Sequence, residues 1–405
     1  MSWVDGAADS LYSIHHLPYG VFSTAEDASP RIGVRIGDFV LDVRLLVAGG
    51  TCPGCQTCSA LSAGNLNPLL AAGGEVWAKV RSRLQDALTN TDLKSSVEQF
   101  LTPVSDVSMH LPFAPGDYVD FYSSEHHAVN VGKIFRPDGD PLMPNWKHLP
   151  VGYHGRSGTI IPSGTDIIRP CGQRRGPEGD IVFGPSTRLD IEAEVGFVVG
   201  APSRQGASVS PDAFTEHVFG VVLVNDWSAR DIQAWEYQPL GPFLGKSFAT
   251  SIGTWVTPLE ALAASRVAAP VQDPAVLSYL KESDRYAYDL SLSVRWNGTE
   301  VSRPPFANMY WSPAQQLAHM TVNGASVRPG DLFASGTVSG PETNQYGSFL
   351  ELTWGGSEPV TLDDGAIRTF LVDGDTVTIS ATAPGPRGVT IGLGEVTGRI
   401  QPAVG

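Results

Sequence analysis

The sequence predicts a β-rich α+β protein with two domains. At 405 residues the chain is long enough for one large and one small domain. Its 44 glycines and 31 prolines are typical of a body with many turns between short strands. Residues 286–296 alternate apolar with polar or small side chains, which predicts a strand, and Asn297-Gly298 then predicts a tight hairpin turn. Prolines and a glycine between 112 and 116 predict a boundary between domains over 1–115 and 116–405.

The smaller, N-terminal domain is predicted to contain both strands and helices. Residues 17–22 and 31–41 have the pattern of short strands separated by Gly-Asp turns. Asn67 followed by proline is a typical start of a helix. A second helix is predicted over residues 75–88. Its apolar stripe consists of Val76, Val80, Leu84 and Leu88.

Charge and hydropathy exclude several classes of function. Lys+Arg 27 against Asp+Glu 42 gives a net charge of −15, which argues against nucleic-acid and anionic-membrane surfaces. A small anionic substrate is still compatible, because local arginines can override the net field. The N-terminus has no basic segment followed by an apolar core, and no stretch approaches about 18 consecutive apolar residues. We therefore expect a soluble, cytoplasmic protein.

Three of the four cysteines lie close together, at Cys52, Cys55 and Cys58. Tetrahedral zinc needs a fourth ligand, and no histidine is near in sequence. A thioredoxin-like pair needs a strand-turn-helix frame that this glycine-rich loop lacks. Reduced, unligated thiols are the favoured interpretation, with metal binding as the alternative, and the sequence does not decide their role.

The segment from 226 to 250 carries the strongest indication of a functional site. It follows an apolar run over 219–224, so Asp226 is predicted at the junction of a strand and a helix. The helix places Arg230, Gln233 and Tyr237 on one face, and Lys246 follows two chain-reversing Gly-Pro breaks. Taken singly, Asp226 could be a helix N-cap and Arg230 a surface ion pair. As a set, these polar groups predict a binding surface at a strand end.

A row of carboxylates predicts a cation site. Asp190, Glu192 and Glu194 alternate with apolar residues, so all three are expected on one face of a strand. The chain that follows is apolar, so these acids are expected to face an interior or cleft, where a cation would relieve their repulsion. Oxygen ligands select Ca²⁺ or Mg²⁺, with Mn²⁺ as a further possibility. The candidate ligands are Asp120, Glu192, Glu194 and Asp226.

Several motifs resemble the fumarylacetoacetate hydrolase family over nearly the whole chain. They begin at Asp120-x-Tyr-x-x-x-x-His127, Leu189-Asp-Ile-Glu-Ala-Glu194 and Asn225-Asp-Trp-Ser-Ala-Arg-Asp-Ile-Gln233, and further matches lie at 144–155, 239–248, 335–340 and 17–24. The resemblance implies an SH3-like N-terminal β domain and a C-terminal mixed β-roll. It also implies a homodimer with the active site near the subunit contact.

The resemblance further implies a reaction and a role for each matched residue. The family hydrolyses a carbon–carbon bond of a β-diketo diacid, giving fumarate and acetoacetate at the end of tyrosine and phenylalanine breakdown. His127 is then the general base, with His126 as the competing candidate, and Glu351 orients it. Glu351 lies between two leucines, as an outward-facing strand residue would. Arg230, Gln233 and Lys246 match the groups that stabilise the alkoxide and carbanion.

The other matched positions fall into two sets. The implied substrate-binding residues are Tyr122, Arg136, Tyr153, Tyr237 and Thr337. The implied cation-binding residues are Asp120, Glu192, Glu194, Asp226, Lys246 and Thr250. An acylpyruvate hydrolase, or a decarboxylase or isomerase of related diacids, is the alternative enzyme, and a calcium-stabilised binding module without chemistry is the alternative from another class.

Overall fold

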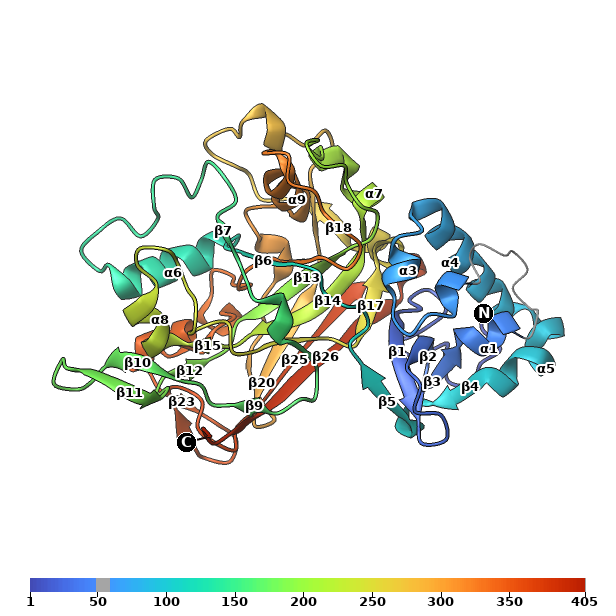
Figure 1. Ribbon diagram of the computed structural model, residues 1–405, viewed down its shortest axis with the longest axis horizontal. Coiled ribbons are helices and arrows are strands. Elements are labelled where there is room, and N and C mark those ends of the chain that lie inside the picture. Colours follow the sequence, from blue (N-terminus) through green and yellow to red (C-terminus); the bar gives the residue numbers. More distant parts are fainter. Residues whose placement is uncertain (49–58, 405) are drawn as a thin grey trace.

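A computed structural model describes residues 1–48 and 59–404 and confirms a β-rich α+β fold (Figure 1). The N-terminal strands and helices gather at one end of the molecule, beside a larger body built from the rest of the chain. Cys52, Cys55 and Cys58 lie outside the described residues. None of the helices in the described ranges combines the length and apolar character needed to cross a bilayer.

The N-terminal part contains the strands and helices that the sequence predicts. Helix α3 begins at Asn67 with a proline in its first turn, and α4 buries Val80, Leu84 and Leu88 while Val76 is half-buried. The strands are β1 (Tyr19–Thr24), β2 (Arg31–Ile36), β3 (Phe39–Asp42), β4 (Leu101–Pro103) and β5 (Val107–His110). The helices are α1 (Val43–Ala48), α3 (Asn67–Leu70), α4 (Gly74–Thr89) and α5 (Lys94–Val97).

One sheet runs from the N-terminal part into the body. Its strand order is β4-β3-β2-β1-β17-β14-β13-β22-β6-β7, so β1 joins the two parts by antiparallel pairing with β17, where Tyr19 lies opposite Val256. The body strands of this sheet are β6 (Tyr118–Phe121), β7 (Gly152–His154), β8 (Ile160–Pro162), β13 (Ala193–Val199), β14 (Val218–Asp226), β16 (Thr250–Ile252), β17 (Trp255–Pro258) and β22 (Leu332–Ala334).

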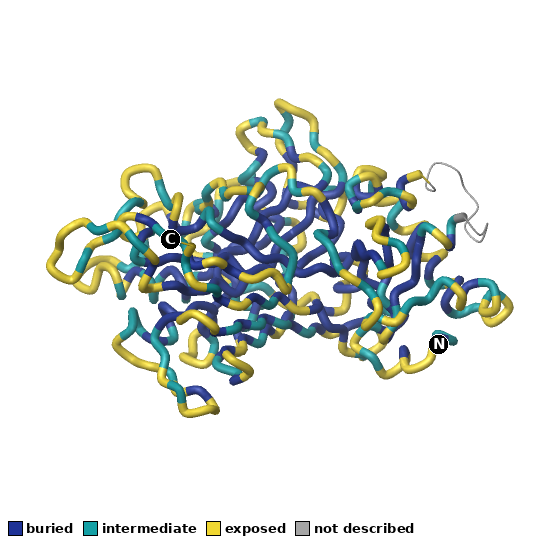
Figure 2. The backbone as a smooth tube through the Cα atoms, turned by 60° about the horizontal axis from the view of Figure 1, so that its bottom comes forward, coloured by how far each residue is buried: buried dark blue, intermediate teal, exposed yellow. Residues whose placement is uncertain are grey.

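A second sheet packs against the first and encloses the larger core. Side chains of β13, such as Phe197, share one buried cluster with Ile379 and Val396 of the second sheet. Figure 2 shows buried chain segments crossing the centre of the molecule, with exposed loops around them. The second sheet has the order β21 (Thr299–Ser302), β20 (Ser291–Trp296), β25 (Thr376–Pro384), β26 (Thr390–Gln401) and β9 (Ile167–Ile168).

Short hairpins and helices complete the body. The two-stranded pairs are β10 (Cys171–Arg175) with β11 (Ile181–Pro185), β12 (Leu189–Asp190) with β15 (Ser228–Ala229), β18 (Arg266–Ala268) with β19 (Tyr286–Tyr288), and β23 (Val360–Thr361) with β24 (Ile367–Arg368). The helices are α6 (Glu125–Phe135), α7 (Phe214–His217), α8 (Arg230–Glu236), α9 (Pro313–Thr321) and α10 (Phe349–Leu352).

The prediction of one continuous strand over 286–296 is wrong in one respect. The chain turns at Asp289 and Leu290, where the Leu290 N–H donates to the Tyr288 carbonyl at 3.0 Å. The two halves therefore pair with different partners, β19 with β18 and β20 with β21 and β25. The hairpin turn that follows is confirmed, because both Asn297 and Gly298 have the positive φ that this turn requires.

A buried carboxylate near the start of α9 makes the fold sensitive to pH. Ser312 caps α9, and its hydroxyl donates to Glu282 at 2.7 Å. Arg285 lies 3.7 Å from the same carboxylate. Burial, opposed in part by Ser312 and Arg285, raises the pKa of Glu282 to about 7. The folded protein therefore keeps a proton there that the unfolded chain loses near pH 4.5.

We predict that Glu282→Gln removes part of the pH dependence of stability. Since the folded pKa of Glu282 is the higher one, wild-type stability falls as the pH rises from about 4.5 to about 7. The free energy of unfolding of the variant, relative to wild type, should rise by about 3 kcal/mol between acidic and neutral pH. Urea titrations across this range measure it, with the exposed Glu75→Gln as control. If the free energies of unfolding of Glu282→Gln and wild type change with pH in parallel, the prediction is contradicted.

Candidate active site

Asp226 ends strand β14, at the strand end that the sequence predicts. The hydroxyl of Thr250, its register partner on β16, donates to one Asp226 carboxylate oxygen at 2.8 Å. The Lys246 ammonium donates to the other oxygen at 2.7 Å. The N-cap of α8 is Ala229, so Asp226 is not a helix cap. It is instead a buried acid held by two polar side chains from the 246–250 segment.

Asp226 belongs to a buried cluster of acids. Oxygen atoms of Asp120, Glu192 and Asp226 all lie within 4.8 Å of one another. Asp120 lies on β6 and Asp226 at the end of β14, in one sheet with β22 and β13 between them, and Glu192 lies in the two-residue link that precedes β13. Glu194 of β13 lies near enough that burial and then the charge of Asp120 raise the pKa of Glu194 well above its usual range. Burial and then Asp226 do the same to the pKa of Asp120.

The donor set of this cluster fits a hard divalent cation. One oxygen of Asp120 and both oxygens of Glu194 are buried without a hydrogen-bond partner among the described residues. Such groups are costly unless something satisfies them, and a bound cation would do so. All the available atoms are carboxylate oxygens, which suit Ca²⁺, Mg²⁺ or Mn²⁺ better than zinc.

Two cationic side chains partly neutralise the cluster. The Lys246 ammonium lies 2.7 Å from both Glu192 and Asp226, and the Arg230 guanidinium lies 2.7 Å from Glu192. Burial alone would lower the pKa of Lys246, but these two carboxylates outweigh it and raise that pKa above its usual value. A protonated ammonium has no lone pair for a metal ion, so this position favours the role of a counter-charge over that of a ligand.

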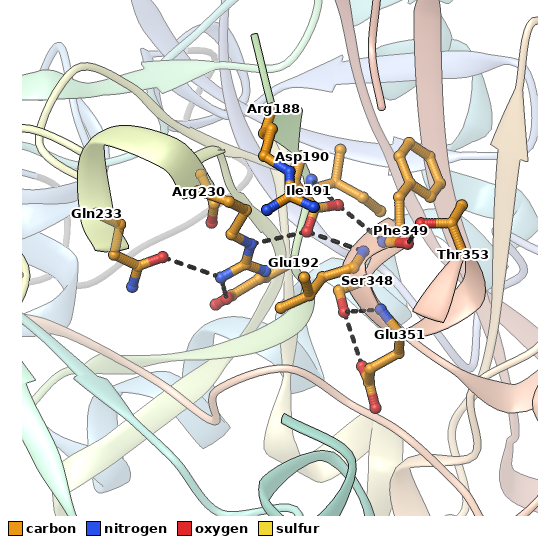
Figure 3. Close-up of polar contacts among 12 residues, drawn as sticks. Arg188, Asp190, Ile191, Glu192, Arg230, Gln233, Ser348, Phe349, Glu351 and Thr353 are labelled. Atoms are coloured by element: carbon orange, nitrogen blue, oxygen red, sulfur yellow. Dashed lines mark hydrogen bonds and ion pairs between the residues drawn. The ribbon is translucent and has the colours of Figure 1, made fainter. Parts of the chain in front are cut away.

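Three polar contacts hold the guanidinium of Arg230, and one of its nitrogen atoms has no partner among the described residues. It begins α8, and its Nε donates to Asp190 at 2.8 Å while its Nη1 contacts Glu192 and donates to Gln233 at 3.2 Å (Figure 3). Its Nη2 is buried and has no hydrogen-bond partner in the described part of the chain. One N–H group of the guanidinium is thus available to a ligand.

The prediction that Asp190 shares a face with Glu192 and Glu194 is wrong. Strand β12 ends at Asp190 and β13 begins only at Ala193, so the alternation of side chains is interrupted between them. The Asp190 carboxylate turns away and accepts hydrogen bonds from Arg230 and from backbone N–H groups. Sequence spacing could not show this, because two residues outside a strand suffice to redirect a side chain.

A second set of polar residues is centred on His127 and Glu351, which contact each other. His127 Nδ1 lies 2.7 Å from a Glu351 oxygen, and both side chains are buried. The segment around His127 is not extended: it opens α6, whose N-cap Ser124 accepts from the His127 backbone N–H. His126 beside it is half-buried. Glu351 lies in α10 and is 1% exposed, so the comparison with an outward-facing strand residue is wrong.

Three side chains that the sequence analysis did not single out hold Glu351. Ser339 and Ser348 donate to the oxygen that faces His127, at 3.0 and 2.8 Å, and Asn130 donates to the other at 3.0 Å. Burial would raise the pKa of Glu351, but His127 and these donors keep it below its usual value. The sequence contains one signal for these contacts to Glu351: serine is a preferred N-cap, and Ser348 directly precedes α10.

The predicted substrate-binding residues divide into an inner and an outer set. Tyr122 packs edge-on against His127 with ring centroids 5.3 Å apart, and the Tyr153 hydroxyl donates to Asp226 at 3.0 Å. Thr337 is 1% exposed, and its hydroxyl has no partner within the described residues. Arg136 and Tyr237 lie at the C-terminal ends of α6 and α8 and are exposed. These two residues make up the outer set, or rim.

A glycine allows Thr337 to approach strand β6. Gly336 has φ +75°, and a Cβ there would lie 2.1 Å from the Phe121 carbonyl oxygen. Any other residue would displace the chain that carries Thr337.

A cavity of about 360 Å³ opens beside the cluster, and Asp226, Lys246 and Tyr153 are among its lining residues.

Comparison with known proteins assigns the family. The sequence model for the fumarylacetoacetate hydrolase C-terminal region matches residues 117–401, and that for the fumarylacetoacetase N-terminal region matches residues 15–112. The chain therefore belongs to the fumarylacetoacetate hydrolase family. It is 46% identical to the fumarylacetoacetase of Homo sapiens, over 100% of this chain and 99% of the relative. The fumarylacetoacetase of Arabidopsis thaliana is 44% identical, over 99% of this chain and 98% of the relative.

Solved structures share the fold at low sequence identity. A fumarylacetoacetate hydrolase from Exiguobacterium antarcticum superposes with a TM-score of 0.56 at 17% identity, covering 95% of this chain and 99% of that structure. A maleylpyruvate hydrolase from Sphingobium sp. SYK-6, solved with manganese(II) and pyruvate, gives a TM-score of 0.53 at 15% identity over 96% of this chain and 100% of that one. Together with the family models, these similarities confirm the predicted fold class.

Proposed function

We propose that this chain hydrolyses 4-fumarylacetoacetate to fumarate and acetoacetate, the last step of tyrosine and phenylalanine breakdown. Curated fumarylacetoacetases that match the chain over its full length support this assignment. The observation that carries it is the buried His127–Glu351 pair, which has the form of a general base and its orienting acid. Close to it lie the acids of the predicted cation site.

The proposed reaction begins with deprotonation of water by His127. Because Nδ1 of His127 faces Glu351, the Nδ1–H donates to the carboxylate and leaves the lone pair on Nε2. The Glu351 carboxylate stays ionised and stabilises the imidazolium that forms, since Asn130, Ser339 and Ser348 hold its negative charge. Water then adds to the carbonyl on the fumaryl side, and a tetrahedral alkoxide results.

Stabilisation of the alkoxide falls to Arg230, Gln233 and Lys246 in this proposal. Arg230 Nη2 supports it, because this buried donor has no partner in residues 1–48 and 59–404 and can serve developing negative charge. Collapse of the alkoxide breaks the carbon–carbon bond and leaves the electron pair on the acetoacetate fragment. Protonation of that carbanion, formally by the proton taken from water, completes a balanced hydrolysis.

Asp120, Glu192, Glu194 and Asp226 are the proposed ligands of Ca²⁺ or Mg²⁺. When bound, such a cation would polarise the attacked carbonyl as a Lewis acid. Thr250 hydrogen-bonds to Asp226 and Lys246 contacts Asp226 and Glu192, so both position the ligands. Tyr122, Tyr153 and Thr337 of the inner set, and Arg136 and Tyr237 of the rim, are the proposed substrate-binding residues. Arg136 supplies positive charge for a dianionic substrate in a protein of net charge −15.

The two alternatives in the sequence analysis are less well supported. An acylpyruvate hydrolase would share the acids, but the full-length relatives are fumarylacetoacetases and the family match includes the N-terminal region. A binding module without chemistry would leave a buried His–Glu pair and an unpaired Arg230 N–H without purpose. We also propose the homodimer and cytoplasmic location that the family resemblance implies. Sedimentation equilibrium tests the dimer, because the measured molar mass should be twice the 43.1 kDa of one chain.

Turnover of fumarylacetoacetate by the wild-type protein is the first test. The ultraviolet absorbance of the conjugated enol should decay, chelation should stop the decay, and Ca²⁺ or Mg²⁺ should restore it. Analysis of the products should show fumarate and acetoacetate. Absence of decay with folded, cation-loaded protein would contradict the proposed substrate, and acylpyruvates would then be assayed.

Replacement of the proposed base gives the second prediction of this subsection. His127→Ala should lower kcat by roughly 10²–10⁴-fold, because water loses the group that removes its proton. Circular dichroism and calorimetry should show that the fold and cation binding persist. His126→Ala is the matched control, since it alters the neighbouring imidazole, and it should keep most of the activity. Wild-type kcat in His127→Ala would remove His127 from the mechanism.

A third prediction concerns the cation. Asp226→Asn should weaken binding of Ca²⁺ or Mg²⁺ by at least about tenfold, because one charged ligand becomes neutral. Isothermal titration calorimetry on chelated protein measures the affinity. Glu282→Gln is the control, as another buried carboxylate changed to an amide outside the cluster, and its affinity should equal that of wild type. Unchanged affinity in Asp226→Asn would exclude Asp226 as a ligand.

A further inference from the structure

Asp190 lies between Arg230, which contacts the acid cluster, and α10, which carries Glu351. It is fully buried, at 0% exposure, and its carboxylate accepts four hydrogen bonds. Figure 3 shows it between Arg230 on one side and the start of α10 on the other. One oxygen accepts from the backbone N–H groups of Ile191 and Phe349, at 2.7 and 2.8 Å. The other accepts from Arg230 Nε at 2.8 Å and from the Leu350 N–H at 3.1 Å.

These contacts place one carboxylate at the start of two helices. Arg230 is the first residue of α8, and Phe349 and Leu350 are the first two residues of α10. Glu351 follows as the third residue of α10. The negative charge of Asp190 therefore faces a guanidinium and two helix N–H groups at once, and both favour an anion.

The contact with Arg230 determines which of its N–H groups is left for a ligand. Asp190 holds Nε and Glu192 holds Nη1, so the planar guanidinium cannot rotate without breaking one of two charged hydrogen bonds. Nη2 is the group left over, since it is buried and none of the described residues pairs with it. A donor that is fixed before the reaction begins stabilises developing charge without reorganisation.

The contact with α10 acts on the other catalytic group. Helix α10 has only four residues, so its own hydrogen bonds define its orientation poorly. Asp190 holds its first turn from one side, and Ser348 bonds to the backbone and side chain of Glu351 from the other. The orientation of Glu351, and through it that of His127, therefore depends on Asp190.

We propose that Asp190 is a positioning residue that couples the charge-stabilising Arg230 to the Glu351–His127 pair. This inference rests on the proposed function, since it assigns Asp190 a role in the same reaction. Asp190 touches neither substrate nor cation; it fixes Arg230 and α10 in one relative arrangement. A small displacement of such groups reduces the rate strongly, by about 10²-fold for 1 Å.

A second buried Asp–Arg pair provides a matched control. Asp42 is 2% exposed, accepts from Arg31 Nε at 2.5 Å, and accepts from the Leu45 N–H in the first turn of α1. It therefore repeats the chemistry of Asp190 in the N-terminal part, among residues that have no place in the proposed mechanism. Asp42→Asn and Asp190→Asn should both lower stability, because each turns an amide toward a donor.

Only Asp190→Asn should alter catalysis by the folded protein. We expect kcat to fall by about 10²-fold with KM within about threefold of wild type, because Arg230 and Glu351 act mainly in the transition state. Asp42→Asn should keep wild-type kcat once the fraction of folded protein is taken into account. Equal kcat in the two variants would overturn the proposal and leave Asp190 a stabilising residue only.

A double-mutant cycle tests the coupling itself. If Asp190 acts through Arg230, Asp190→Asn should have a smaller effect in protein that already carries Arg230→Gln. The factor by which Asp190→Asn lowers kcat should be at least tenfold smaller there than in wild type. Fully multiplicative losses would overturn that coupling. Wild-type inactivity toward fumarylacetoacetate would instead contradict the proposed function, which is a separate result.

A measurement without substrate covers the case in which Asp190→Asn does not fold. In ¹⁵N-arginine-labelled wild-type protein, the Arg230 Nε–H should exchange slowly with solvent. Its signal is assigned by its loss in Arg230→Gln. Rapid exchange would show that Asp190 does not hold the guanidinium, and would overturn the proposal whatever the substrate of the protein.

Discussion

Burial of like charges is the constraint on which the rest of the site depends. Asp120, Glu192 and Asp226 lie together in the interior, with Glu194 beside them. Each ionised carboxylate loses its hydration there, and each repels the others. Lys246 and Arg230 supply two positive charges to Glu192 and Asp226, while two oxygens of Glu194 and one of Asp120 have no hydrogen-bond partner among the described residues. A divalent cation would satisfy that remaining demand.

Strands of one sheet carry three of the acids, Asp120 on β6, Glu194 on β13 and Asp226 at the end of β14. Because β22 separates β6 from β13, and Glu192 lies just before β13, pairing of adjacent strands does not by itself bring these carboxylates together. The proposed base and its partner acid lie in helices, His127 in α6 and Glu351 in α10. Side-chain hydrogen bonds hold them there: the Ser124 hydroxyl accepts from the His127 backbone N–H, and Ser348 and Asn130 donate to the Glu351 carboxylate. The proposed base therefore depends on side-chain hydrogen bonds at helices, whereas three of the four proposed cation ligands lie on strands.

The sequence predicts the fold class and the place of Asp226, because strong apolar runs and turn pairs report local structure. It fails at Asp190, at Glu351 and at the break near Asp289, where backbone direction changes within two or three residues. Such changes depend on partners that are distant in the chain, as when Arg230 and Phe349 engage Asp190. Periodicity contains no information on those partners.

The dependence of α10 on outside contacts has a consequence for how catalysis and stability are linked. A four-residue helix is not stable on its own, so the orientation of Glu351 depends on outside contacts. Asp190, Ser348 and the stacked Trp296–Phe349 pair hold the first turn of α10, and Asn130 and Ser339 hold the carboxylate. Phe349 and Trp296 are fully buried between α10 and the second sheet, with ring centroids 3.9 Å apart. The larger core therefore supports the proposed base directly.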